Sequence, residues 1–177
     1  AEFAEGVVRP HEKTFSGVIS DRLRLMETCK AQFSQIFSLY SDQEQEVISS
    51  LEQVREAEPL LRVEDQNSNT HTLWRVTDQE ALRYVQRFFA DKPVYIADGH
   101  HRYTTALDCR RRALAADPAL PADHPCHYIM MYLCACEDPG LSVLPTHRLV
   151  RWPGTMSADQ LRERMQQGMQ VTEIQQG

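Results

Sequence analysis

The sequence predicts an α/β fold in which helices pack on a mixed sheet. Short apolar runs alternate along the chain with stretches of helical spacing, and these stretches begin at residues typical of helix caps. Hydrophobic residues make up 42% and charged residues 25% of the 177 residues, as in ordinary globular domains. No internal repeat or low-complexity tract interrupts this order. An α+β arrangement is the alternative.

The first elements follow from apolar runs and cap residues. Residues 6–10 predict a short strand, and a helix is expected from about Ser20. Residues 33–40 have the aromatic and β-branched content of a strand. Ser41 and Glu44 then form the pattern of a capping box, which predicts the start of the next helix.

A hairpin and a further helix are expected next. The strand-like runs 60–63 and 70–76 flank residues 66–69, a Gln-Asn-Ser-Asn segment that favours a turn. Thr77 and Glu80 form a second capping-box pattern, and the helix behind it has an apolar face.

The second half of the chain repeats the strand-and-helix order. Residues 94–97 predict a short strand that leads through a tight turn into a long helix. Residues 127–136 predict a long strand, and a Pro-Gly turn leads from it into a second strand over 141–144. A helix capped by Ser157 and a terminal strand over 169–174 complete the expected elements.

We expect one α/β domain over residues 1–177, with 1–76 and 77–177 as potential sub-lobes. The chain stops directly after a strand-like pattern, so we interpret it as a fragment of a longer protein.

Net charge, hydropathy and cysteine content indicate which partners and which cellular compartment to expect. The net charge is -6, and Arg110, Arg111 and Arg112 form the one basic run, so we expect no nucleic-acid partner. The longest apolar run, 128–135, has the length of a buried strand, and we expect no membrane partner. Five cysteines without a CxxC pair favour a cytoplasmic protein. The sequence leaves the oligomeric state open, and a homo-oligomer is compatible with it.

The turn from Asp98 to Arg102 is the main candidate site. A strand that turns sharply into a helix presents unpaired backbone N–H groups and the positive end of the helix dipole, which together bind anions. Gly99 permits the sharp bend, while His100, His101 and Arg102 add donors where a phosphate would bind. Asp98 has three open roles: it can orient a histidine, accept a proton or bind a divalent metal. In the structural alternative, Asp98 only caps the helix and the histidines pack locally.

Two secondary clusters lie elsewhere in the sequence. The loop residues His11, Glu12 and Lys13 offer a carboxylate and a cation that could meet a nucleotide or a metal, with a solvated loop as the alternative. Thr146, His147 and Arg148 follow an expected strand, where α/β ligands often bind. A further cluster contains the cysteines Cys126, Cys134 and Cys136. For these residues we favour packing in the core over metal binding.

Four segments together resemble the signature stretches of a bacterial family of uncharacterised conserved proteins, catalogued as domain of unknown function 1015. They are VRPHEKT at 8–14, SQIFSLYS at 34–41, ADGHHRYTTAL at 97–107 and LPTHR at 144–148. The resemblance extends along nearly the whole chain. Membership names no reaction by itself.

Over a shorter stretch, the strand, DGHHR turn and helix resemble the nucleotide-binding motif of the ParB and sulfiredoxin superfamily, which includes free-serine kinases. The resemblance implies a core of that type around this unit, with nucleotide phosphates held by Gly99, His100, His101 and Arg102. Sulfiredoxins have a cysteine in this turn, where this sequence has histidine. Reductase chemistry is therefore not expected.

These observations lead to the hypothesis of a nucleotide-dependent enzyme, a kinase-like phosphotransferase acting on a small metabolite such as an amino acid. The cofactor would be ATP or another nucleotide with Mg²⁺, held by Asp98 or Glu12. Asp98, His100 and His101 are the catalytic candidates, with His100 and His101 stabilising charge on the transferred group. Two alternatives are a non-catalytic nucleotide-binding switch protein and a hydrolase of a phosphorylated metabolite.

Overall fold

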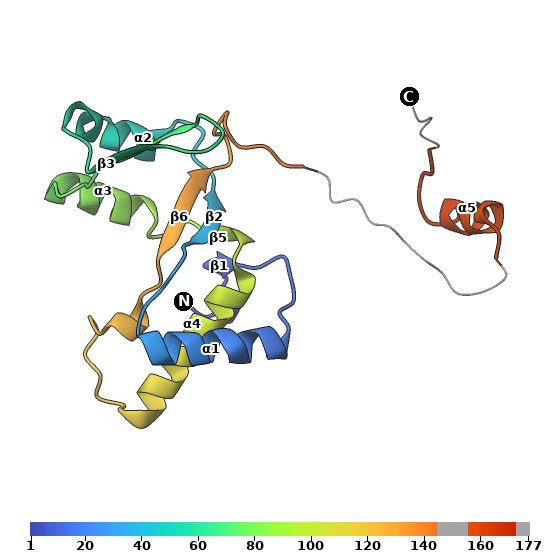
Figure 1. Cartoon of the computed structure of the whole chain (residues 1–177), viewed down its shortest axis with the longest axis horizontal. Coiled ribbons are helices and arrows are strands. Elements are labelled where there is room, and N and C mark those ends of the chain that lie inside the picture. The colour runs from blue at the N-terminus through green and yellow to red at the C-terminus, as the bar shows by residue number, and fades with distance from the viewer. Residues whose placement is uncertain (145–155, 173–177) are drawn as a thin grey trace. The chain divides into compact units, whose positions relative to one another are not determined.

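The computed structural model describes residues 1–144 and 156–172. The chain divides into two compact units, Ala1–Ser142 and Val143–Gly177, and each is described by itself. The first unit contains four helices and all six strands of the described residues (Figure 1). The mixed sheet with helices packed on it confirms the predicted α/β class.

A four-stranded mixed sheet forms the centre of the first unit. Its strand order is β1-β5-β2-β6, so β5 and β2 are the inner strands. β1 runs parallel to β5, β5 runs antiparallel to β2, and β2 runs parallel to β6. The sheet thus combines strands that precede residue 76 with strands that follow it. The strands are β1 Val8–Arg9, β2 Ile36–Tyr40, β5 Val94–Asp98 and β6 Met131–Ala135.

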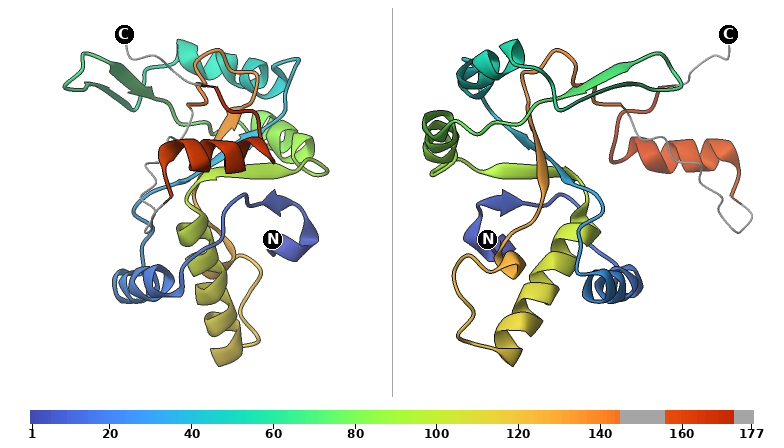
Figure 2. Two further views of the ribbon diagram at one scale, coloured as in Figure 1. Left: turned by 90° about the vertical axis from the view of Figure 1, so that its right-hand side faces the viewer. Right: turned by 60° about the vertical axis from the view of Figure 1, so that its left-hand side comes forward.

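Helices α1 (Ser16–Cys29) and α4 (His100–Ala116) lie together at one end of this sheet, where Figure 2 shows α4 running away from the end of β5. Burial of apolar side chains on α4 and three strands holds this end together. The cluster consists of Val8, Ile36, Ile96, Tyr103 and Leu107.

Helices α2 (Glu46–Leu51) and α3 (Gln79–Phe88) pack together at the other end. Their apolar side chains meet the sheet in a second cluster, which consists of Tyr40, Val47, Phe88 and Ala135. Strand β2 joins the two clusters, because alternate residues of a strand share one face. Ile36 lies in the first cluster and Tyr40 in the second, four residues further along β2.

The predicted hairpin is confirmed. β3 (Leu61–Glu64) and β4 (Thr70–Leu73) pair antiparallel as a separate two-stranded sheet. The Asp65 carboxylate accepts hydrogen bonds from the backbone N–H groups of Asn67 and Asn69, which closes the turn. Three short 3₁₀ helices complete the connections: η1 Phe3–Glu5, η2 Glu52–Glu56 and η3 Pro125–His127.

Neither predicted capping box of the first unit forms, and the N-cap of α2 is Gln45, four residues later than the predicted Ser41. At α2 the carboxylate of Asp42 accepts the backbone hydrogen bonds, while the Ser41 hydroxyl donates to Glu137. At α3 the cap is Asp78 rather than Thr77. In both cases an aspartate follows the predicted hydroxyl residue, and its charge interacts more favourably with the positive end of the helix dipole.

Other boundaries differ from the prediction as well. α1 begins at Ser16 instead of about Ser20, and β6 is shorter than the expected strand because η3 precedes it. Residues 141–144 form no strand, and the side chains of Val143 and Leu144 are exposed.

The second unit contains α5 (Ala158–Gln166). Its cap is Ser157, as predicted, and the side chain of Gln160 completes a capping box. Of the predicted terminal strand, residues 169–172 have no strand conformation, and 173–174 lie outside the described residues. Within the described ranges, none of the helices has the length and apolar character needed to cross a membrane.

Candidate functional site

The candidate site begins where β5 ends and α4 starts. Gly99 is the N-cap of α4, with φ at 102°, a conformation that residues with a Cβ rarely adopt. A Cβ at this position would lie 2.8 Å from Nη2 of Arg102 and 3.2 Å from Cδ1 of Ile36. The backbone conformation therefore favours glycine here, and a Cβ would displace the Arg102 side chain.

The start of α4 has no capping side chain. No side chain of the described residues accepts a hydrogen bond from its first turn, and that turn contains no acidic residue. The first N–H groups of a helix have no partner inside the helix. They leave a concentrated positive potential at this end of α4.

Arg102 folds back over Gly99 and contributes the charged group of the turn. Its Nη2 lies 2.6 Å from Oδ2 of Asp98, whose side chain is largely exposed. Its Nε is buried and has no hydrogen-bond partner among the described residues. Asp98 thus orients the guanidinium and leaves other donors of Arg102 unused.

His100 and His101 attach the loop before α1 to the start of α4. Nε2 of His100 accepts the backbone N–H of His11, and Nε2 of His101 accepts the backbone N–H of Phe15, each at 3.1 Å. The Phe15 ring also stacks on the His101 ring. Because Nε2 accepts in each case, the proton of the neutral ring is on Nδ1.

His100 is a neutral hydrogen-bonding residue in this arrangement. Its side chain is buried, and burial lowers its pKa, an effect that the neighbouring His11 strengthens. Protonation of Nε2 would also break the bond from the backbone of His11. Of the turn's side chains, Arg102 therefore supplies the permanent positive charge.

Glu12 lies beside two imidazoles. Its carboxylate oxygens lie 3.6 Å from Nδ1 of His100 and 3.8 Å from Nε2 of His11. Nδ1 of His11 and the carbonyl oxygen of Ile96 are 2.8 Å apart, so the ring donates there and keeps a lone pair on Nε2. The rings of His11 and His100 meet edge to face at 4.5 Å. We call Glu12, His11 and His100 the Glu12 cluster.

The Glu12 cluster has potential metal ligands within 4.8 Å of one another. The backbone bond of His11 is the kind of support that metal-binding histidines receive. In contrast, Nδ1 of His100 carries the ring proton and faces Glu12 as a donor. The cluster therefore offers one free imidazole nitrogen and one exposed carboxylate. For Mg²⁺, which prefers oxygen, Glu12 is the fitting ligand, and Asp98 is engaged by Arg102.

The structure thus brings together residues 98–102 and the loop that carries His11 and Glu12, more than 80 positions apart in sequence. Lys13 is exposed and has no ion pair within the described ranges. Thr146, His147 and Arg148 lie outside the described residues. Among the residues described, no cysteine takes part in a potential metal cluster.

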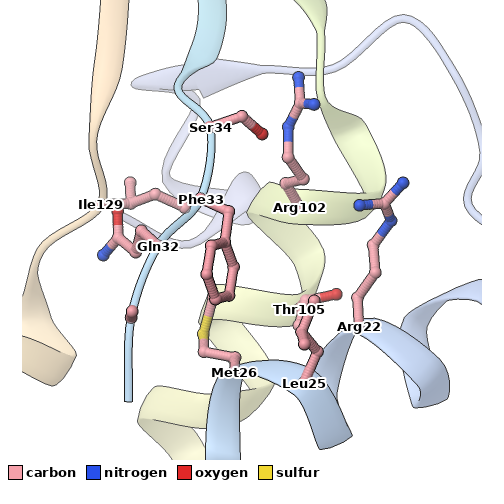
Figure 3. Close-up of a pocket in the computed structure, with 10 residues that line it drawn as sticks. Arg22, Leu25, Met26, Gln32, Phe33, Ser34, Arg102, Thr105 and Ile129 are labelled. Atoms are coloured by element: carbon pink, nitrogen blue, oxygen red, sulfur yellow. The ribbon is translucent and has the colours of Figure 1, made fainter. Parts of the chain in front are cut away.

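Arg102 also lines a pocket that was not predicted from the sequence. It lies between α1, the segment before β2 and α4, and Arg22 and Ser34 line it together with Arg102 (Figure 3). The signal in the sequence was weak: Arg22, Leu25 and Met26 have the spacing of one helix face, but nothing indicated that this face meets α4.

The basic run on α4 is engaged in ion pairs. Arg110 and Arg111 pair with Glu2, and Arg112 pairs with Glu27. The hydrogen bond from Arg111 lowers the pKa of Glu2. These arginines interact within the protein, as expected for a helix surface.

Comparison with known proteins gives a family without a described activity. Neither the search of curated proteins nor the search of solved structures finds a match. The model of the family described as "Protein of unknown function (DUF1015)" matches residues 1–177. The match covers the whole chain, and the protein therefore belongs to the DUF1015 family.

Proposed function

We propose that the protein binds a nucleotide or another phosphorylated small molecule at the start of α4 and transfers a phosphoryl group to a small metabolite such as an amino acid. The uncapped first turn of α4, with Arg102 held beside it by Asp98, is the observation that carries this proposal. Free N–H groups, the helix dipole and a guanidinium all favour a phosphate at this place.

The other helices support this interpretation. First-turn N–H groups of α2 and α3 donate to the carboxylates of Asp42 and Asp78, and one of α5 donates to the hydroxyl of Ser157, so each of these helix starts has an acceptor within the protein. α1, which starts without a side-chain cap, has no cation in its first turn. α4 combines the two features, and an external anion would satisfy both.

The residues of the turn have distinct roles in this proposal. Arg102 contacts the phosphate through Nη donors that Asp98 leaves free. Glu12 has an exposed carboxylate that can accept a proton from the substrate hydroxyl, and Nδ1 of His100 lies 3.6 Å from it. Mg²⁺, when bound at Glu12, would neutralise charge on the phosphates. The ParB-like motif is consistent with this nucleotide site.

A non-catalytic switch is the second candidate. His100 and His101 both accept backbone bonds from the loop at residues 11–15, so a ligand at α4 would act directly on that loop. Occupancy of the site could then be communicated without turnover.

Calorimetry tests the binding part of the proposal. ATP and CTP are titrated into the full chain with Mg²⁺ present, and saturable binding of at least one is expected. Arg102→Lys removes the planar fork and should weaken binding by about tenfold or more. Arg112→Lys, on the same helix but away from the turn, is the matched control and should bind as the wild type. Absence of saturable binding by any nucleotide would overturn the proposal.

Turnover separates the enzyme from the switch. Glu12→Gln keeps the size of the side chain but removes its charge and basicity, so it should abolish phosphoryl transfer, while nucleotide affinity measured without Mg²⁺ should change little. The readout is phosphate transferred to an amino acid or released to water. If the wild type binds nucleotide but neither transfers nor releases phosphate, the protein is a non-catalytic switch. If it releases phosphate from phosphorylated metabolites but not from nucleotides, it is a hydrolase.

A further inference from the structure

The pocket between α1 and α4 has a charged side and an apolar side. α1 contributes Arg22, Leu25 and Met26, which lie on one helix face at spacings of three and four residues. Figure 3 shows the guanidinium groups of Arg22 and Arg102 at one end and the side chains of Met26 and Leu25 at the other. The cavity measures about 70 Å³, enough for one small chemical group.

The charged side of this pocket lacks a matching negative charge. Its lining contains two arginines and no acidic residue. Arg22 has no ion pair with any described residue. Asp98 pairs with Arg102, but it contacts Nη2 and leaves the buried Nε without a partner.

This arrangement is unfavourable without a ligand. Two guanidinium groups on one small pocket repel each other, and a buried N–H donor without a partner is unfavourable. An anion between Arg22 and Arg102 would relieve both effects. The hydroxyl of Ser34 points toward Arg102 in Figure 3 and lines the same pocket, where it could serve as a further donor.

The apolar side indicates which anion fits. Leu25, Met26 and Phe33 line it and offer no hydrogen-bond partner to a group with charge on every side. A phosphate has charged oxygens in all directions, whereas a carboxylate has one charged end and a hydrocarbon remainder. The pocket therefore matches a carboxylate whose short aliphatic part faces the apolar wall.

We propose that Arg22 and Arg102 bind the carboxylate of a small carboxylic acid in this pocket. The identity of this acid as the acceptor substrate rests on the proposed function, because Arg102 would then lie between the phosphate at the start of α4 and the carboxylate. Binding of the acid itself does not depend on phosphoryl transfer.

Nuclear magnetic resonance tests this proposal through the arginine Nε–H signals of the full chain. Sodium propionate is the probe, sodium phosphate is the alternative anion, and sodium chloride at equal ionic strength is the reference. We expect saturable shifts of the Arg22 and Arg102 signals with propionate, whereas phosphate should shift the Arg102 signal alone. Equal or larger shifts of the Arg22 signal with phosphate, or no Arg22 shift with propionate beyond that of chloride, would overturn the carboxylate assignment.

Variants of α1 make the test specific. Arg22→Gln should weaken propionate binding about tenfold or more, and Arg22→Lys should restore only part of it. Arg24→Gln removes a charge from an exposed position on the same helix outside the pocket and should change nothing. Unchanged propionate affinity in Arg22→Gln would contradict the proposal.

The ATP titration separates failure of this proposal from failure of the proposed function. Arg22→Gln should keep wild-type ATP affinity, because Arg22 is placed in the acid pocket only. Loss of ATP binding in this variant would show that the pocket belongs to the nucleotide site, and would also contradict the proposal.

Discussion

The starts of α2 and α4 follow the two inner strands of the sheet but are built differently. At α2, the buried carboxylate of Asp42 accepts the backbone N–H groups of Glu46 and Val47 at 2.9 and 3.0 Å. At α4, Gly99 has no side chain, and Arg102 adds a positive charge to the positive end of the helix.

The start of α2 is therefore stabilised by the protein itself, whereas the start of α4 is free to bind a ligand. Asp42 supplies the anion that α2 needs, and Glu137 in turn accepts the backbone N–H of Asp42. At α4 the protein supplies donors and no capping acceptor among the described residues. The same helix physics therefore stabilises the fold at one end of the sheet and provides a binding site at the other.

Asp42→Ala should have the largest effect on stability. It removes both acceptors from a buried helix start, and the cost should be about 3 kcal/mol of unfolding free energy from the lost cap and the unpaired N–H groups. Urea unfolding measures this loss. Asp42→Asn keeps one acceptor and should lose less; nucleotide affinity of folded Asp42→Asn should stay at the wild-type value. A loss below about 0.5 kcal/mol for Asp42→Ala would show that the cap is not structural.

Gly99→Ala should have a smaller effect on stability but a clear effect on binding. We expect a loss of about 2 kcal/mol, because Ala disfavours positive φ and its Cβ would displace Arg102. Gly6→Ala is the matched control: Gly6 also has positive φ but has open space around it, so it should cost about 1 kcal/mol. Urea unfolding and ATP titration are applied to both variants. Equal losses in both assays would contradict a special role of Gly99.

Protonation of His100 should have the smallest effect on the free energy of unfolding of the three changes considered, and it should appear as a pH dependence. The folded state lowers the pKa of His100, so between that value and the unfolded value of about 6.5 the unfolded chain binds more protons. The contribution of His100 is complete above pH 6.5 and decreases as the pH falls through this window. His100→Gln, which keeps an acceptor for the backbone of His11, should flatten this part of the stability profile. An unchanged slope would contradict the neutral, buried state of His100.

Local signals predicted the strand–turn–helix unit of the site. The apolar run over 94–97, the glycine after it and the helical stretch that follows are adjacent in sequence, and the structure has them as β5, Gly99 and α4. The aspartates that accept N–H groups at the starts of α2 and α3 were missed because each directly follows the hydroxyl residue that was predicted instead. Only the three-dimensional course of the backbone decides which of the two reaches the N–H groups.

Long-range contacts of the site could not be read from the sequence. His11 and Phe15 contact the histidines of α4 across more than 80 positions, and these contacts decide which ring nitrogen is protonated. The sequence suggested that His100 donates to a phosphate, whereas in the structure its Nε2 accepts a backbone bond and its burial favours the neutral ring. Arg22 was missed for the same reason, because its position beside Arg102 depends on how α1 packs on α4.

Backbone ¹H–¹⁵N spectra of the full chain, recorded while ATP and Mg²⁺ are added, test the central claim most directly. We predict saturable shifts that are largest at the amides of His100, His101 and Arg102, with little change at Glu46 and Val47, where Asp42 already occupies the helix start. Shifts at Glu46 and Val47 as large as those at the start of α4, or no saturable shifts at α4, would contradict the account.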